Sequence, residues 1–303
     1  MFKFGFGLRE AGLLVGLAFG ACDKTPPPPS EAPAASSSGA MANEQTGTVQ
    51  VSGSSALQPL VNAAKETFEA AHKGFSVEVS AGGSKKGLAD VAAGAVQIGD
   101  SDIFAPEDLK GELIDHRVAV VGFAAMANKG TFNEKISAVS LADLARIFSG
   151  EVKNWKEVGG TNQPIVVINR SPNSGTRAVF GSIVLGGDKF VESQTEDNSG
   201  ALVAKLKQTK GAISYLALSF ADPDLRIFGV KSDAGSTEPG PSSITEGVYP
   251  IWSYEHMYTK GQPTGPTKVF LDYVTSADFQ ERVLPTVKGF IPVTKMKVSR
   301  NKD

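Results

Sequence analysis

The segment that decides the fold is the stretch from residue 48 to residue 71, TVQVSGSSALQPLVNAAKETFEAA. Residues 48–52 alternate between polar and apolar types, which is typical of a short strand with one buried face. From Leu57 to Ala71 the apolar residues recur at intervals of three and four, the stripe of an amphipathic helix. The turn between them is Gly53-Ser54-Ser55-Ala56. The segment therefore predicts a strand that runs through a glycine-serine turn into a helix.

The same alternation continues along the chain and predicts an α/β fold built from strand-helix-strand units. Further strands are expected at 75–81, in a short segment ending at Asp100, and at 118–126, 165–168, 212–215, 225–230 and 256–259. Further helices are expected at 86–93, at 141–148, from about 176, at 202–206 and at 269–274. The segment 231–243 is rich in Gly, Ser and Pro, which predicts a loop between lobes.

Composition narrows the class of protein. A chain of 303 residues with 41% hydrophobic residues suffices for about two domains and is not disordered as a whole. The formal net charge of -2 lacks the basic excess of a general nucleic-acid binder, so no nucleic-acid partner is expected. One cysteine and three histidines exclude a disulfide scaffold and argue against a metal site. Nucleotide-binding glycine motifs are absent, so we expect no cofactor.

The N-terminus has the pattern of a targeting signal. Residues 1–21 combine early basic residues with the apolar run 11–21, which is too short for a membrane span but suits a secretory signal peptide. Cys22 follows directly, and the junction resembles a bacterial lipoprotein signal, in which this cysteine is acylated. The alternative is a lone buried cysteine. Residues 22–47, rich in Pro, Ala and Ser, are expected to form a flexible tether.

Three strand-to-helix turns are candidates for an anion site. They are Gly53-Ser54-Ser55-Ala56, Gly82-Gly83-Ser84 and Arg170-Ser171-Pro172-Asn173-Ser174-Gly175-Thr176. The start of a helix offers unpaired backbone N–H groups and a partial positive charge, and glycine allows close approach of a ligand. Any one of these turns alone is more simply a helix cap, and Asp102 alone is more simply an ordinary turn residue. Together the turns predict a cage of donors around one small anion, with Arg170 as its full positive charge.

These motifs resemble those of the phosphate-binding proteins of bacterial high-affinity phosphate ABC transporters, over about residues 48–295. The resemblance rests on the three turns and on Gly99-Asp100-Ser101-Asp102, Gly211-Ala212-Ile213-Ser214-Tyr215 and Gly289-Phe290-Ile291-Pro292-Val293. It implies phosphate contacts at eight residues, namely Ser55, Ala56, Ser84, Asp102, Arg170, Ser174, Gly175 and Thr176. In that family an acidic residue often follows the arginine by two positions and pairs with it, whereas Pro172 stands here. Arg170 is then expected either to interact more strongly with the ligand or to be restrained by a different carboxylate.

The resemblance also implies a two-lobe periplasmic binding protein of type II, in which each lobe is a mixed sheet flanked by helices and the ligand lies in the cleft. Lobe one is expected at 48–124 plus 248–303, and lobe two at 125–247. The implied function is the delivery of inorganic phosphate to the permease subunits of an ABC transporter. We expect a monomer, periplasmic and anchored to a bacterial membrane by a lipid on Cys22, with no metal and no catalytic residue. An oxyanion-sensing lipoprotein remains an alternative, and a phosphate-ester enzyme would need a metal cluster or an activated nucleophile.

Overall fold

The computed structural model describes residues 46–131, 136–233 and 235–301. The expected signal peptide, Cys22 and nearly all of the expected tether lie outside these described residues. All of the described residues belong to one compact unit. Within the described ranges, no helix has both the length and the apolar character needed to cross a membrane.

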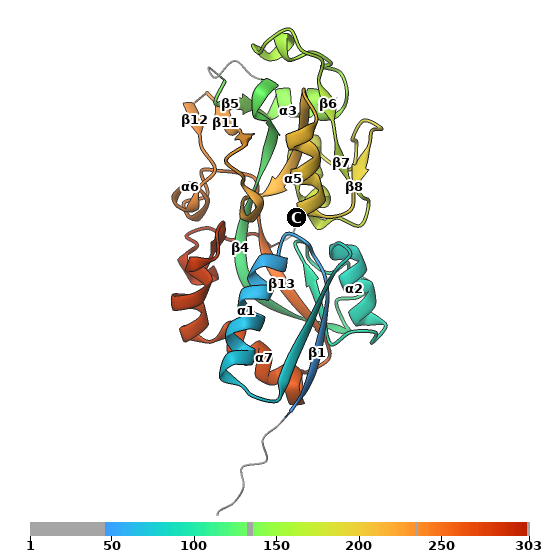
Figure 1. The fold of residues 1–303 in the computed structure, drawn as a ribbon, viewed down its shortest axis with the longest axis vertical. Helices are drawn as coiled ribbons and strands as arrows, with labels where there is room; N and C mark the ends of the chain where they lie inside the picture. The colour runs from blue at the N-terminus through green and yellow to red at the C-terminus, as the bar shows by residue number, and fades with distance from the viewer. Residues whose placement is uncertain (1–45, 132–135, 234, 302–303) are drawn as a thin grey trace, which may run out of the picture. The chain divides into compact units, whose positions relative to one another are not determined.

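The N-terminal strand-turn-helix units form as the sequence predicts. Strand β1 (Gly47–Gly53) lies parallel to both β2 (Phe75–Ala81) and β3 (Ile98–Ser101). Between these strands run helices α1 (Gln58–Ala71) and α2 (Ser84–Ala92), seen in the lower half of Figure 1. The apolar stripe of α1 is its buried face and consists of Leu60, Val61, Ala64 and Phe68. The carboxyl ends of β1 and β2 therefore lead directly into the turns that precede the two helices.

One long strand connects the two halves of the sheet. Strand β4 (Leu113–Asn128) has 16 residues, and its segment 118–127 is completely buried. Its residues 113–122 pair antiparallel with β13 (Trp252–Lys260) and, at 120–121, with β14 (Phe290–Ile291). Its residues 123–128 pair antiparallel with β9 (Ala212–Ala217) and β10 (Leu225–Ile227). The nine-stranded sheet has the order β2-β1-β3-β13-β4-β9-β6, with β10 and β14 paired to β4.

The remaining elements lie mostly around β9, in the upper half of Figure 1. The strands are β5 (Ala138–Ser140), β6 (Val166–Val167), β7 (Asn169–Arg170), β8 (Thr195–Glu196), β11 (Gly229–Ser232) and β12 (Gly235–Thr237). The helices are α3 (Leu141–Phe148), α4 (Gly175–Phe180), α5 (Ser199–Gln208) and α6 (Pro241–Thr245), with α7 (Gly265–Thr275) packing beside β1 and α1. Sheets flanked by helices are thus present in both halves, as expected for an α/β fold.

The prediction of a loop over 231–243 is wrong in part. Residues 235–237 form β12, which pairs antiparallel with β11, and α6 begins at Pro241. Gly235 has a φ of +119°, a backbone conformation that favours glycine, at the start of β12. This ribbon is largely exposed and polar. It therefore carries no apolar alternation from which a strand could be predicted.

Candidate functional site

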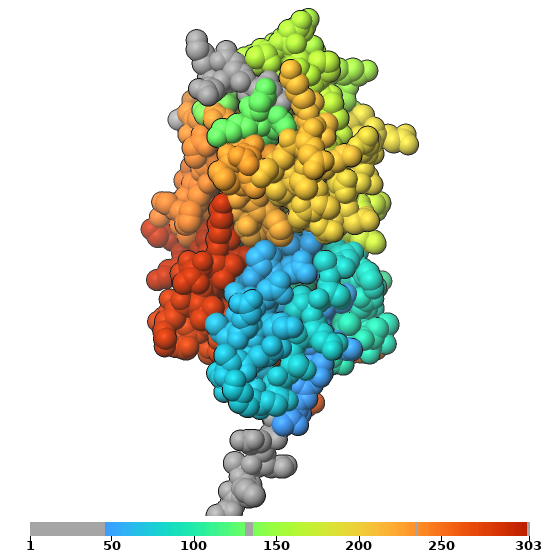
Figure 2. Space-filling model, viewed as in Figure 1, coloured from blue at the N-terminus to red at the C-terminus, as the bar shows by residue number. Residues whose placement is uncertain are grey.

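The three predicted turns meet in one buried cluster. Lys85 at the second turn donates its backbone N–H to the carbonyl oxygen of Asn173 in the third, at 3.1 Å. Arg170 Nη2 donates to Ser55 Oγ of the first turn, at 3.0 Å. In Figure 2 the yellow residues that include the start of α5 lie directly against the blue residues that include the start of α1. The cluster therefore joins segments that are far apart in the sequence.

Asp102 connects all three turns. Its carboxylate accepts hydrogen bonds from Ser54 Oγ in the first turn and, at 2.8 Å, from Thr176 Oγ1 in the third. Its backbone N–H donates to Ser84 Oγ in the second turn at 2.9 Å. Asp102 is 1% exposed, so these contacts are shielded from water. Its carboxylate contacts the hydroxyls of two other turns and does not simply cap the turn that follows it.

Two glycines permit this close approach. Gly83 has a φ of +87°, and a Cβ there would lie 2.5 Å from the carbonyl oxygen of Asn173. At Gly175 a Cβ would lie 2.1 Å from Ser84 Oγ and 3.0 Å from the Cβ of Asp102. Real Cβ atoms do not approach other atoms so closely. Glycine at 83 and 175 is therefore a condition for the contact between the second and third turns.

The guanidinium of Arg170 is buried, with 1% of the residue exposed, and its recorded partners are neutral oxygens. Besides Ser55 Oγ, it donates to Ser199 Oγ at 3.3 Å and to the carbonyl oxygen of Asp197 at 3.5 Å, while its Nε has no partner. Within the described ranges no carboxylate lies within 4.0 Å of its nitrogens. Of the two alternatives for Arg170, restraint by a different carboxylate therefore finds no ion pair in this part of the chain.

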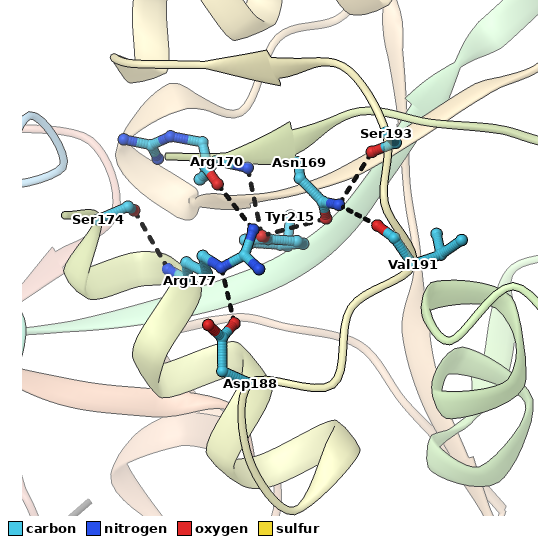
Figure 3. Close-up of polar contacts among 8 residues, drawn as sticks. All are labelled: Asn169, Arg170, Ser174, Arg177, Asp188, Val191, Ser193 and Tyr215. Atoms are coloured by element: carbon cyan, nitrogen blue, oxygen red, sulfur yellow. Dashed lines mark hydrogen bonds and ion pairs between the residues drawn. The ribbon is translucent and has the colours of Figure 1, made fainter. Parts of the chain in front are cut away.

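The backbone of Arg170 is held from the opposite side (Figure 3). Its N–H donates to the Tyr215 hydroxyl at 3.2 Å, and its carbonyl oxygen accepts from Arg177 Nη1 at 2.9 Å. Arg177 is itself paired with Asp188 at 2.7 Å. Burial raises the pKa of Tyr215 to about 12, so its hydroxyl stays protonated and can donate onward to Asn169. This network fixes where the Arg170 side chain begins, and Figure 3 shows the guanidinium pointing away from it.

Charge in the cluster is nearly balanced. Burial lowers the pKa of Arg170, while the neighbouring charge of Asp102 acts in the opposite direction. Burial, and then the charge of Asp102, raise the pKa of Asp100 well above its ordinary value, which favours the neutral acid. Asp100 is 1% exposed and its Oδ1 has no partner. The site therefore presents one cation and one anion, surrounded by hydroxyls and backbone N–H groups.

The structure brings all eight predicted site residues into this cluster. Ser55, Ser84, Asp102, Arg170 and Thr176 are linked by the hydrogen bonds above, and Gly175 lies against Ser84. The backbone N–H of Ala56 donates to Ser54 Oγ at 3.0 Å. Ser174 caps α4 by accepting from the backbone N–H of Arg177 at 3.2 Å. In this structure, therefore, Ser174 has the capping role that was the simpler alternative for the third turn.

Sequence reasoning missed Ser199. It is the first residue of α5, whereas the apolar pattern predicts that helix only from Leu202. Its hydroxyl lies 3.1 Å from Ser55 Oγ, and its backbone N–H donates to the same oxygen at 3.2 Å. The signal in the sequence is Asn198-Ser199-Gly200, a capping residue and small residues at the start of a helix. Within the described ranges no group of His, Cys, Asp and Glu residues is placed to hold a metal.

Comparison with known proteins places this geometry in a family. The profile of the PBP superfamily domain matches residues 38–278. The phosphate-binding protein PstS of Bacillus subtilis is 46% identical over 264 residues, which cover 84% of each chain. The chain belongs to the PstS family of phosphate-binding proteins. PstS of Borreliella burgdorferi is 25% identical over 262 residues, covering 81% of this chain and 90% of the relative.

Solved structures agree with this membership of the PstS family. A Clostridium perfringens protein assigned as a phosphate ABC transporter substrate-binding protein, with bound phosphate, has a TM-score of 0.75 and 27% identity. The match covers 82% of this chain and all of that one. An ABC-type phosphate transport receptor from Vibrio cholerae, at 20% identity and a TM-score of 0.65, shares the fold over 81% of this chain and all of its own. The prediction of a two-lobe α/β binding-protein fold is confirmed.

Gly175→Ala tests whether contact between the second and third turns is needed for ligand binding. Phosphate is the probe, because the Clostridium perfringens structure holds it. The added Cβ would meet Ser84 Oγ at 2.1 Å, so we expect calorimetric titration to show affinity at least tenfold weaker. Gly200→Ala is the matched control, since its Cβ would meet only Asn198 Oδ1, at 3.6 Å. Equal affinities in the two variants would contradict this account of the site.

Proposed function

We propose that this protein binds inorganic phosphate between its two lobes and delivers it to the permease subunits of an ABC transporter. The observation that carries the proposal is the buried guanidinium of Arg170, which has a free Nε and no ion-pair partner within the described ranges. A buried guanidinium without an ion-pair partner is costly. A small oxyanion would supply that partner and several acceptors for the surrounding donors. The phosphate-bound relative supports phosphate as that ion.

The proposed lobes are residues 48–124 plus 248–303 and residues 125–247. Under this division Ser55, Ser84 and Asp102 belong to lobe one, and Arg170 with residues 174–176 belongs to lobe two. The hydrogen bonds from Arg170 to Ser55 and from Thr176 to Asp102 then cross between the lobes. A ligand that touches both lobes stabilises the closed arrangement over an open one, because only differential contact shifts such an equilibrium. The permease would recognise this closed form.

Donors and acceptors in the site suit a protonated oxyanion. The starts of α2 and α5 bring backbone N–H groups to the cluster, and Arg170 adds positive charge. Asp102 contributes only acceptor oxygens when ionised. Each carboxylate oxygen has a hydroxyl partner already and retains a lone pair for a further donor, such as the hydroxyl of a phosphate that still carries a proton. We therefore propose binding without turnover and assign no catalytic residue.

The proposal extends to the location of the protein. The lipoprotein-like junction at Cys22 favours acylation there, and the tether expected over residues 22–47 would separate the folded unit from the membrane surface. The protein would then work in the periplasm as a lipid-anchored monomer. A sensing role, by contrast, would require binding without delivery to a permease.

Replacing Arg170 tests the proposed function. We expect Arg170→Ala to weaken phosphate binding by about 3 kcal/mol, roughly 100-fold, because a charge-assisted contact to a desolvated anion is lost. Lys86→Ala is the matched control, since this exposed lysine at the second turn pairs with Asp90 and lies outside the cluster. Calorimetric titration gives both affinities, and thermal unfolding checks the fold of each variant. Phosphate affinity unchanged in Arg170→Ala would refute the site.

Asp102 is expected to select phosphate over sulfate. Phosphate brings a proton at neutral pH, whereas sulfate would face the carboxylate as an unpaired like charge. The substitution Asp102→Asn replaces one acceptor oxygen by a donor NH₂ group and keeps the shape of the side chain. We therefore expect the ratio of phosphate to sulfate affinity, measured by competitive titration, to fall at least tenfold. If Asp102 only joins the three turns, both affinities will weaken together and their ratio will stay constant.

The lipid anchor is tested by Cys22→Ser in cells that express the full chain. We expect the variant to move from the membrane fraction to the soluble periplasmic fraction, because a serine cannot receive the thioether-linked lipid. Immunoblotting of washed membranes and periplasmic extracts measures the distribution. A variant that stays in washed membranes would show that Cys22 is not the anchor.

A further inference from the structure

Ser199 lies between Arg170 and Ser55 of the proposed site. Its hydroxyl accepts from Arg170 Nη1 at 3.3 Å and lies 3.1 Å from Ser55 Oγ. Its backbone N–H donates to Ser55 Oγ at 3.2 Å, and Arg170 Nη2 reaches the same oxygen at 3.0 Å. Ser199 has no exposed surface. The three side chains form a closed triangle of hydrogen bonds.

The guanidinium of Arg170 needs a hydrogen-bond acceptor of this kind, because its long side chain does not by itself fix the direction in which the planar group points. A carboxylate could hold it with two parallel hydrogen bonds, but none lies within 4.0 Å in the described ranges. The acidic groups near Arg170 are Asp102 after β3 and Asp197 before α5, and Asp197 contacts it only through its carbonyl oxygen. Tyr215 on β9 holds its backbone N–H. The side chains that orient the guanidinium are therefore the hydroxyls of Ser55 and Ser199, and the longer contact to the carbonyl oxygen of Asp197 is the third partner.

We propose that Ser199 is a positioning residue of the phosphate site, which orients Arg170 through its hydroxyl and secures Ser55 through its backbone N–H. This inference rests on the proposed function. A neutral hydroxyl holds Arg170 in place without neutralising it, so the full positive charge remains available to the ligand. Ser199 and Arg170 belong to the same proposed lobe, whereas Ser55 belongs to the other, so Ser199 would hold Arg170 in both arrangements and Ser55 would join the two only on closure.

A double-mutant cycle separates this role from a general effect on α5. We expect Ser199→Ala to weaken phosphate binding about tenfold in the wild-type protein, as measured by calorimetric titration. In the Arg170→Lys background, Ser199→Ala should lower phosphate affinity less than about twofold. Lysine has a single ammonium group and lacks the planar guanidinium that Ser199 would orient. Asn198→Ala is the control. Its side chain caps α5 by accepting from the backbone N–H of Ala201 at 2.9 Å, so it should lower the unfolding temperature with little effect on affinity.

A charged variant tests the need for a neutral partner. Ser199→Asp keeps an acceptor beside Arg170 but adds a negative charge, so we expect weaker phosphate binding than in Ser199→Ala. The inference would be overturned if Ser199→Ala lowered phosphate affinity equally in the wild-type and Arg170→Lys proteins. It would also be overturned if Ser199→Asp bound phosphate more tightly than Ser199→Ala. Both results require a wild-type protein that binds phosphate. If the wild type does not bind phosphate, the proposed function itself fails, which is a distinguishable outcome.

Discussion

The rest of the site depends on the burial of one carboxylate. Asp102 is shielded from water, and an ionised group in that environment must find hydrogen-bond donors within the protein. Those donors are the hydroxyls of Ser54 and Thr176, which come from turns on either side of the cluster. Meeting this requirement brings the turns before α1 and α4 together, and the backbone N–H of Asp102 adds the start of α2 by donating to Ser84 Oγ. The same constraint explains why small residues stand at 83 and 175, where any larger side chain would separate the turns.

Arg170 presents the complementary problem of a buried cation. Its backbone is fixed by Tyr215 and Arg177, and its guanidinium meets only neutral oxygens. With Asp100 favoured in its neutral form, Arg170 and Asp102 bring one positive and one negative charge to the cluster, but they form no ion pair with each other. The arrangement favours a small anion that can accept from many donors and give one proton back. A larger or wholly deprotonated anion meets fewer of these requirements.

Sequence analysis succeeded where the determinants are local. The turns at 53–56, 82–84 and 170–176 follow strands and precede helices, and this pattern is visible in a short window. The partner of Arg170 could not be predicted in this way, because Ser199 lies 29 residues away and precedes the apolar stripe of α5. The half-exposed start of β4, residues 113–117, was missed because its side chains are largely polar. Local chemistry thus indicated which residues gather, whereas the contacts among them required the tertiary structure.

Strand β4 has a mechanical consequence. One continuous strand is hydrogen-bonded to β13 in one half of the sheet and to β9 in the other. The two halves are therefore connected here by a paired β-strand and not by a flexible loop. Under the proposed two-lobe division, rotation of one lobe against the other would twist this strand near residues 122 and 123, where its pairing passes from β13 to β9. Any strain that closure puts on this strand would be released on opening. Ligand release would then be assisted by the backbone itself, at a cost in affinity that the buried contacts must exceed.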